Sequence, residues 1–254
     1  MPETGLLIVN ADDFGGNPLA TDRIAECFRA GTITSTSAMM HMNDSKRAAS
    51  IAKSRELPVG LHLNLTQPFD DPRTPRAVRE RQAGAARRFA GSRVQRLSYN
   101  PFLSSLVRAC IADQLECFRA LYDREPTHID GHNHVHLSPT VLLALPAATC
   151  TRTAESPAGA TSSPGALLRR ARGAFISRRY TTTDRFVAID RLGSSPSTQE
   201  IDQLLALADR SSLEIMTHPD RERDHRLLMS ERWRAALKCQ TLGSFAALRA
   251  TASQ

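Results

Sequence analysis

The chain has 254 residues, of which 41% are hydrophobic and 23% charged, as in an ordinary water-soluble globular protein. It contains no run of about 18 apolar residues, which excludes a membrane-spanning helix and argues against a membrane partner. The apolar stretch at residues 6–9 is too short for a signal peptide, so we expect a cytoplasmic location. The five scattered cysteines form no C-x-x-C pair, which argues against a disulfide framework and a thiolate zinc site.

The net charge of +7 comes almost entirely from arginine, because the chain has only three lysines, Lys46, Lys53 and Lys238. The arginines concentrate in segments 73–96 and 169–179. We interpret them as solvated surface, with an anionic substrate or partner as the first alternative and nucleic acid as the second. Nucleic acid ranks last because aromatic residues make up only 5% of the chain and no recognition motif accompanies the charge.

Strands and helices alternate along the predicted chain. Strands are predicted at residues 6–9, at 32–40, at 58–65, from 126 onward and at 213–217. Helices are predicted at 20–30, at 44–55 with Asn43 or Asp44 as N-cap, at 104–124, at 200–210 and at 231–238. Segments 70–98 and 151–185 are predicted as irregular, the first with some helix. This order implies a parallel sheet with crossover helices, and we expect one domain over residues 1–254.

Two adjacent carboxylates, Asp12 and Asp13, follow the first predicted strand. Their burial is unfavourable unless a positive charge neutralises them, and a divalent cation would do so. Neighbouring strand residues point to opposite sides, so both can serve one site only if the strand ends here, which Gly15 and Gly16 permit. The alternative is that one aspartate merely caps the next helix. The residues leave open which aspartate would bind a metal.

The predicted strand at 58–65 carries His62 between two leucines, so this histidine faces the side opposite to theirs. A lone histidine in such a place is commonly a core residue. Its position at the carboxyl end of a strand, where α/β proteins form their active sites, makes it a candidate ligand.

Segment 128–136 holds four of the eight histidines, His128, His132, His134 and His136, together with Asp130. If the segment were extended, its period of two would place all of them on one face. Gly131 is expected to end the strand, which would move the last two histidines onto a loop or the start of a helix. Clustered imidazoles with a carboxylate that orients one of them are typical of a metal site.

His218 follows the last predicted strand and is either a proton donor facing the metal or part of a surface turn. Carboxylate and imidazole ligands without thiolate suit one catalytic divalent ion, Zn²⁺ first, with Mg²⁺, Mn²⁺ and Co²⁺ as alternatives.

Four segments together resemble the YdjC-like carbohydrate deacetylases, a family that includes chitooligosaccharide deacetylases. They are residues 10–15 (NADDFG), 60–63 (GLHL), 127–136 (THIDGHNHVH) and 217–219 (THP). The resemblance implies a distorted (β/α) TIM-like barrel in a single domain, and hydrolysis of an N-acetyl group on an amino sugar. It also implies metal ligands Asp13, His62 and His132, with Asp12 as general base.

Two segments depart from the family's pattern. Asp220 replaces the glycine that usually follows the late His-Pro pair, and residues 151–155 (TRTAE) echo an Arg-Pro-Arg-Glu type of segment only faintly. Both segments are expected to line the substrate side.

The expected reaction is metal-assisted hydrolysis of an acetamide, in which Asp12 takes a proton from water and His218 protonates the leaving amine. One alternative is a phosphoesterase with two metal ions, for which His134 and His136 would be further ligands. Another is a non-catalytic sugar- or nucleic-acid-binding protein, against which the intact Asp12 argues. An N-acetylated amino sugar is the expected partner, and the oligomeric state, including a homo-oligomer, is left open.

Overall fold

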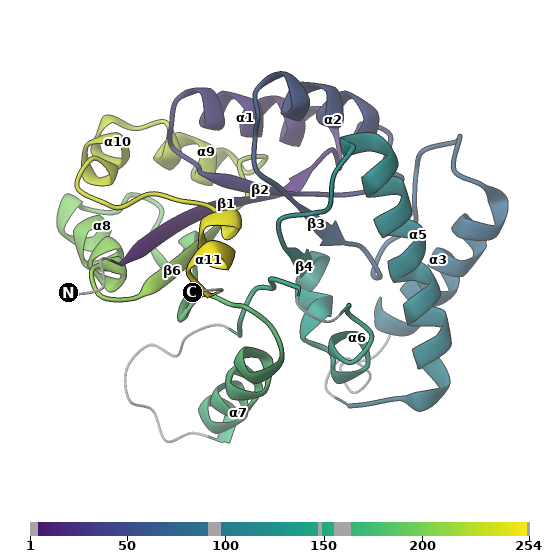
Figure 1. Ribbon diagram of the computed structural model, residues 1–254. Coiled ribbons are helices and arrows are strands. Elements are labelled where there is room, and N and C mark those ends of the chain that lie inside the picture. Colours follow the sequence, from purple (N-terminus) through teal and green to yellow (C-terminus); the bar gives the residue numbers. More distant parts are fainter. Residues whose placement is uncertain (1–4, 91–97, 147–148, 155–163, 253–254) are drawn as a thin grey trace.

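A computed structural model describes residues 5–90, 98–146, 149–154 and 164–252. Its sheet has six parallel strands in the order β4-β3-β2-β1-β6-β5 (Figure 1). The strands are β1 (Leu6–Phe14), β2 (Ser35–Ala38), β3 (Val59–Leu63), β4 (Ile129–Gly131), β5 (Arg185–Ala188) and β6 (Ser212–Thr217). The sheet curls into a half-barrel, which confirms the predicted parallel α/β architecture and the distorted TIM-like class.

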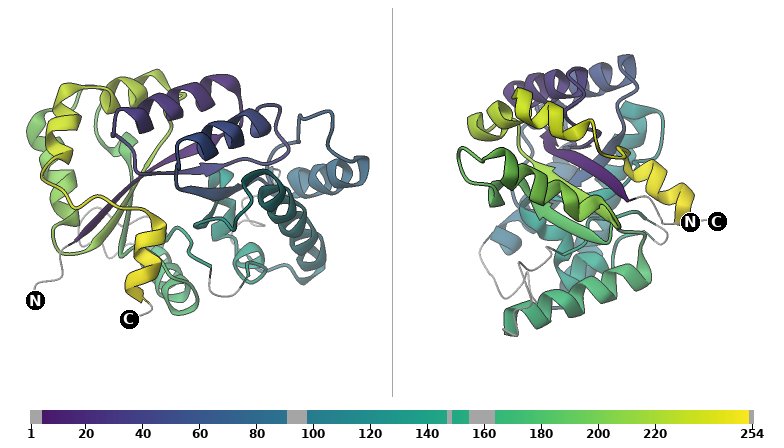
Figure 2. Two further views of the ribbon diagram at one scale, coloured as in Figure 1. Left: turned by 45° about the horizontal axis from the view of Figure 1, so that its top comes forward. Right: turned by 90° about the vertical axis from the view of Figure 1, so that its left-hand side faces the viewer.

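Helices cover the sheet and close its sides (Figures 1 and 2). The α-helices are α1 (Pro18–Arg29), α2 (Ser45–Ser54), α3 (Arg76–Ala90), α5 (Ser104–Tyr122), α6 (Pro139–Leu142), α7 (Pro164–Arg179), α8 (Thr198–Leu205), α9 (Glu222–Leu228), α10 (Glu231–Leu237) and α11 (Phe245–Ala252). The 3₁₀ helices are η1 (Pro101–Leu103), η2 (His132–Leu137), η3 (Ile189–Arg191) and η4 (Ala206–Ala208). In the part of the chain described, no helix is long and apolar enough to cross a membrane.

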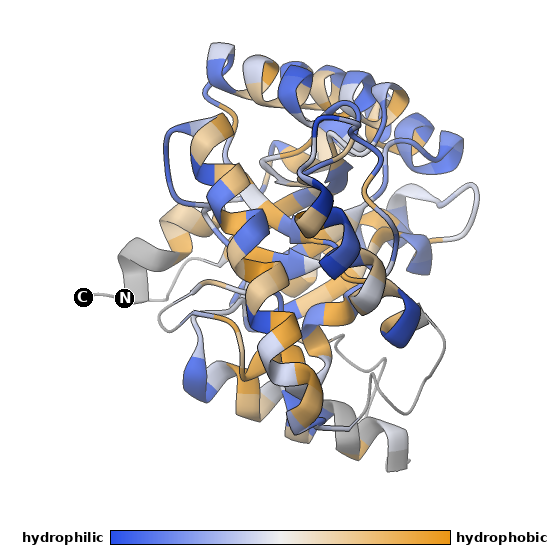
Figure 3. Cartoon of the chain, turned by 90° about the vertical axis from the view of Figure 1, so that its right-hand side faces the viewer, coloured by the Kyte–Doolittle hydropathy of each residue, from blue (hydrophilic) through white to orange (hydrophobic). Residues whose placement is uncertain are grey.

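Local sequence signals explain where several helices begin. The Asn17 side chain accepts a hydrogen bond from the backbone N–H of Ala20, and Pro18 occupies the first turn of α1. Ser197 and Glu200 form a capping box at the start of α8. Along α5 the buried residues recur at helical spacing, as expected of a helix that packs one face on the core. Figure 3 views this side of the molecule, where the helices carry both hydrophilic and hydrophobic residues.

The ends of the half-barrel are closed by segments distant in sequence. Beyond β4, single bridges join Ile129 to Thr151 and Cys150 to Thr181, so residues 150–152 lie beside the sheet edge. At the amino ends of the strands, the ring of Phe245 in α11 stacks on His128, with 3.8 Å between the ring centroids. These segments do not cover the carboxyl ends of the strands, where the candidate functional side chains lie.

The two segments predicted as irregular contain regular structure. Segment 70–98 contains α3, which agrees with the helix expected within it. Segment 151–185 contains α7 and leads directly into β5; neither element was predicted, and neither were α9 and α11. Asp44 stands at the N-cap position of α2, as one of the two predicted residues, although its side chain makes no capping hydrogen bond. The strands at residues 6–9 and 213–217 were predicted correctly, although β1 extends five residues further, to Phe14.

The strands alternate between an apolar outer side and a polar inner side. Outward residues such as Val9, Leu61 and Ile215 belong to the main hydrophobic core beneath the helices. The inner side carries a hydrogen-bonded set of buried polar residues: Asn10, Asp12, Ser37, His62, Asp130 and Glu214. The half-barrel therefore encloses a polar interior below its carboxyl-terminal edge.

Candidate metal and catalytic site

A distortion of β1 brings both aspartates to one site. The register between β1 and β2 shifts between Ala11 and Phe14, and Asp13 has a left-handed backbone with φ 71°. Such a bulge turns a side chain that regular alternation would send to the opposite face. The expectation that the strand ends at the aspartates was therefore wrong, because β1 continues to Phe14 and the bulge, rather than a glycine turn, makes the side chains converge.

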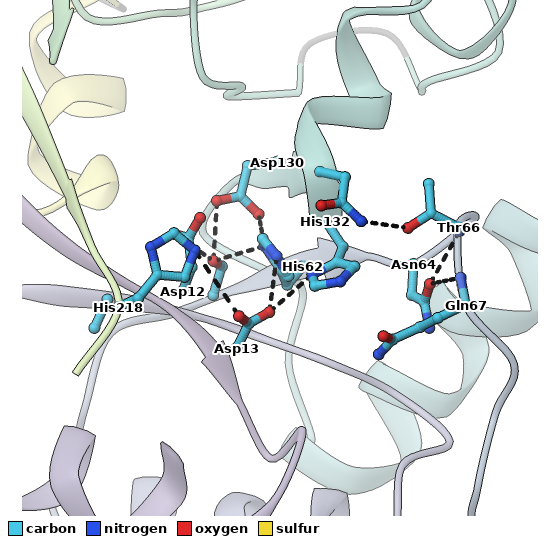
Figure 4. A network of polar contacts seen from close by, with 12 residues as sticks. Asp12, Asp13, His62, Asn64, Thr66, Gln67, Asp130, His132 and His218 are labelled. Carbon is cyan, nitrogen blue, oxygen red and sulfur yellow. Dashed lines mark hydrogen bonds and ion pairs between the residues drawn. The ribbon is translucent and has the colours of Figure 1, made fainter. Parts of the chain in front are cut away.

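Asp13, His62 and His132 form the candidate metal site (Figure 4). Asp13 Oδ1 lies 3.2 Å from His62 Nε2 and 3.0 Å from His132 Nδ1, and the three donor atoms lie within 4.8 Å of one another. Burial by itself would raise the pKa of Asp13, but hydrogen bonds from His132 and His62 outweigh it and lower that pKa. One carboxylate from β1 and two imidazoles, from β3 and from the start of η2, converge in a way that fits a divalent cation well.

Asp130 orients the buried ligand candidate His62. Its Oδ1 lies 2.7 Å from His62 Nδ1, which leaves Nε2 directed at Asp13. Ser37 donates a hydrogen bond to the other oxygen of Asp130 at 2.9 Å. Such carboxylate support is typical of histidines that bind metals. The sequence analysis grouped Asp130 with the histidines of its own segment, whereas the structure pairs it with a histidine of the neighbouring strand.

Arg152 lies at the centre of the polar interior and is fully buried. Its Nη1 and Nη2 donate to the two carboxylate oxygens of Asp12 at 2.8 and 2.7 Å. Nη2 also forms an ion pair with Asp130 Oδ2 at 2.7 Å, and Nε donates to Glu214 Oε1 at 2.7 Å. The expectation that segment 151–155 lines the substrate side was wrong for Arg152, which lies behind the aspartates; Glu155 lies outside the described residues.

A second group, Asp12, His62 and Asp130, also lies close enough to hold an ion. Both of its carboxylates already pair with the guanidinium of Arg152, which would repel a second cation there. The charge of Arg152 lowers the pKa of Asp12 despite the opposing effect of burial, so Asp12 is ionised at neutral pH. Asp13, which does not contact Arg152, is the better ligand candidate.

Of the remaining predicted residues, His218 lies near Asp13, whereas His134 and His136 do not join the candidate metal site. His218 Nε2 lies 3.9 Å from Asp13 Oδ2, and its backbone N–H donates to Asp224 Oδ2 at 3.0 Å. His134 and His136 follow a kink in η2, where Asn133 and His134 are left-handed, and neither belongs to a metal-type cluster of the described residues. The two-metal alternative thus gains no support from them.

A polar rim adjoins His132 (Figure 4). The Asn133 side chain donates a hydrogen bond to Thr66 Oγ1 at 3.1 Å, which links the loop after β3 to the start of η2. Asn64 Oδ1 accepts the backbone N–H groups of Thr66 and Gln67 at 3.1 Å each, which fixes the turn. These hydrogen bonds hold the loop after β3 against the start of η2, next to His132.

Fold and site together define an α/β half-barrel that carries a carboxylate–imidazole cluster at the carboxyl ends of its strands. The family model described as "YdjC-like protein" matches residues 6–240, and the chain belongs to this family, as the sequence motifs suggested.

Relatives of known description agree with this assignment. A human protein named carbohydrate deacetylase is 31% identical, over 84% of this chain and 74% of its own length. A Yersinia enterocolitica protein named chitooligosaccharide deacetylase is 32% identical, over 84% of this chain and 81% of its own.

Two solved structures show the same fold. One is an Enterococcus faecalis protein named as a candidate for cellobiose-phosphate cleavage, with a TM-score of 0.69 and 22% identity over 97% of this chain and 99% of its own. The other is a family 4 acetyl xylan esterase from Clostridium thermocellum in complex with a cobalt ion, with a TM-score of 0.55 and 11% identity over 98% of this chain and 92% of its own.

Proposed function

We propose that this protein is a metal-dependent hydrolase that removes an N-acetyl group from an amino sugar or a glycosylated metabolite and releases acetate. The observation that carries the proposal is the convergence of Asp13, His62 and His132 beside the ionised Asp12. The names of the relatives, carbohydrate deacetylase and chitooligosaccharide deacetylase, support the choice of substrate class.

Asp13, His62 and His132 would hold one divalent ion, Zn²⁺ first, with Mg²⁺, Mn²⁺ and Co²⁺ as alternatives, because their donors are oxygen and nitrogen without sulfur. When bound, such an ion supplies the Lewis acidity that polarises an amide carbonyl and acidifies water. The contribution of the chain is to fix the donors, and Asp130 does this for His62.

Asp12 is proposed as the general base. Its Oδ1 accepts hydrogen bonds from Arg152, Asn10 and Ser37, whereas among the described residues its Oδ2 accepts one hydrogen bond, from Arg152. This oxygen would take a proton from the water whose oxygen attacks the acetamide carbonyl carbon. Because Arg152 keeps Asp12 ionised, the base is ready at neutral pH.

His218 is proposed as the proton donor to the leaving amine. It lies on the side of Asp13 opposite His132 (Figure 4), and the hydrogen bond from its backbone N–H to Asp224 fixes the turn that carries it. When the C–N bond breaks, a proton from His218 would leave the sugar as a free amine, while the acyl carbon leaves as acetate.

The decisive experiment is incubation of the metal-loaded protein with a panel of N-acetylated sugars, sugar nucleotides and glycosylated metabolites. Mass spectrometry would follow the loss of an acetyl group and the appearance of acetate. Separate preparations loaded with each of the four metals would identify the one that supports turnover. A panel on which no preparation releases acetate would overturn the proposal.

His62→Ala and His132→Ala test the ligand set. Each should lose both bound metal and turnover, because each removes one of three ligands. His225→Ala is the matched control, since this histidine pairs with Glu26 on the surface at 2.9 Å and lies outside the cluster. If either ligand variant retains full metal content and activity, the assigned ligands are wrong.

A further inference from the structure

Glu214 is a buried acidic residue of β6 to which the proposed reaction gives no part. It is fully buried, and its nearest charged group is the guanidinium of Arg152. We propose that Glu214 is a positioning residue that holds Arg152 by its Nε and so sets the places of Asp12 and Asp130. This inference rests on the proposed function only for its kinetic test.

Arg152 is shared between two parts of the candidate site. It donates hydrogen bonds to Asp12, the proposed base. It also pairs with Asp130, whose other oxygen makes the hydrogen bond that orients His62. A guanidinium is a rigid planar fork, so the direction of its Nε–H determines where both Nη groups point. Glu214 Oε1 accepts that Nε–H at 2.7 Å and thereby fixes the plane of the fork.

The packing around Glu214 argues against a purely structural role. Its cross-strand neighbours on β1 and β5 are Ile8 and Phe186, both buried and apolar, so an apolar residue would complete this layer. A carboxyl group here loses its hydration, and its Oε2 has no hydrogen-bond partner among the described residues. The hydrogen bond to Arg152 is the contact that accounts for an acid at this position.

The aromatic ring of Phe186 completes the support of Arg152. The guanidinium carbon lies 5.0 Å from the ring centroid, so one face of the fork is covered while its edge is bonded to carboxylates. The fork can therefore turn within its plane only if the Nε–H loses its acceptor. Glu214 holds the Nε side of the fork against this turn, while Asp12 and Asp130 hold its Nη groups.

The test compares Glu214→Met, which keeps the length of the side chain but lacks a good acceptor, with Glu214→Gln, whose amide oxygen can still accept from Nε. In the metal-loaded protein we expect Glu214→Met to lower kcat by about 10²-fold with little change in KM. Without the acceptor for its Nε–H, Arg152 shifts and moves the carboxylate of Asp12 away from the position in which it can take the proton. Glu214→Gln should retain most of the wild-type kcat. A wild-type kcat for Glu214→Met, or an equal loss in both variants, would overturn the inference.

Ile215→Ala is the matched control for lost stability. Ile215 is the next residue of the same strand and is equally buried, but it packs in the helix-facing core. This variant should unfold more easily, yet the folded fraction should keep its kcat. An equal loss of kcat in Ile215→Ala would reduce Glu214 to a structural residue.

A second readout does not depend on activity. The Nε–H signal of Arg152, assigned by its absence in Arg152→Lys, should shift in the ¹⁵N–¹H spectrum of Glu214→Met and remain near its place in Glu214→Gln. If Glu214→Met does not fold, Glu214→Asp replaces it in both readouts, because it withdraws the acceptor by one methylene group. An unshifted signal overturns the inference, whereas a shifted signal with no acetate release from the wild type overturns only the proposed function.

Discussion

At the scale of single residues, Asp12 and Asp13 differ by their surroundings and not by their chemistry. Asp12 is held by Arg152 and is almost fully buried, whereas Asp13 faces His62 and His132 across a bulge. Two identical side chains that are neighbours in sequence thus have different contacts, because the left-handed backbone of Asp13 itself redirects its side chain.

The two amide variants should fail differently. Asp12→Asn cannot accept a proton but leaves the three proposed ligands in place, so metal content should persist while turnover falls by roughly 10²–10⁴-fold. Asp13→Asn replaces an anionic ligand by a neutral one, so metal affinity should fall and added metal should partly restore activity. Elemental analysis paired with turnover at saturating metal separates the two. Should Asp12→Asn empty the site while Asp13→Asn leaves it full, the roles must be exchanged.

At the scale of elements, β3 depends on a close approach that only glycine permits. A Cβ atom at Gly60 would lie 2.3 Å from the nearest ring atoms of His128. That ring is fully buried and stacked on Phe245, so it has no room to move away. Strand β3, which carries His62, therefore packs in close contact with His128, the residue before β4. Phe245 of α11 packs on the other face of the His128 ring.

Gly60→Ala should destabilise the protein by about 1–3 kcal/mol, as overpacking of a closed core does. The measurement is the free energy of unfolding from a denaturant titration. Gly84→Ala is the control, because a Cβ there meets only Leu106 Cδ2 at 3.9 Å in the middle of α3. It should be neutral or stabilise by about 0.5–1 kcal/mol. Equal stability of Gly60→Ala and the wild type would contradict this picture of β3.

Helix α3, which the sequence indicated only as some helix within a loop, and helix α7, which it did not predict, have weak periodic signals for physical reasons. In α3 the buried stripe is Gln82, Ala85, Ala86 and Phe89, which has helical spacing but only one large apolar side chain. In α7 the large apolar residues Leu167 and Phe175 are exposed, and Ile176 is buried on the opposite side. A helix that packs along a narrow line needs no strong amphipathic pattern, so its sequence resembles a loop.

At the scale of the whole molecule, the buried charges couple stability to pH. Burial raises the pKa of Glu214 from its ordinary 4.5 to about 7, against the opposing charge of Arg152. The folded protein therefore retains a proton that the unfolded chain releases between these pH values. This stabilisation is complete below the unfolded pKa and is lost as pH rises through 7.

Comparison with Glu214→Gln isolates this effect, because the amide does not titrate. Relative to that variant, the wild type should lose up to about 3 kcal/mol of unfolding free energy as the pH rises from about 4.5 to above 7. Urea titrations of both proteins across this range give the difference, in which the common contributions of the other carboxylates cancel. If the unfolding free energies of the two proteins change in parallel with pH, Glu214 has the same pKa in the folded and unfolded chains.

The net charge of +7 also acts at this scale. Several arginines of the segment 73–96 are paired, Arg73 with Asp71, Arg76 with Glu80 and Arg81 with Asp113, which reduces the free positive charge. We therefore expect only weak binding to DNA or RNA, sensitive to salt and without sequence preference. Fluorescence anisotropy with labelled duplexes at low and physiological salt measures this. Tight binding at physiological salt would favour the nucleic-acid-binding alternative.

By itself the sequence indicated which polar residues gather at the candidate site, and it predicted the parallel α/β architecture. Polar residues at the carboxyl ends of apolar strands must lie on one edge of a parallel sheet, so the pair Asp12 and Asp13, His62, the histidines of segment 128–136 and His218 could be grouped without coordinates. This works because the periodicity of a strand is a local property, and the motifs lie directly at the strand ends. The choice of Asp13, His62 and His132 as ligands came from the family resemblance, and the structure brings these three together.

Only the tertiary structure decided how the interior is organised. Arg152 reaches Asp12, Asp130 and Glu214 because two single bridges bring segment 150–152 beside β4, and no local pattern encodes those bridges. The bulge that separates Asp12 from Asp13 likewise arises from the register between β1 and β2. Contacts between residues 62 to 140 positions apart depend on how the whole chain closes, which is why the sequence left them open.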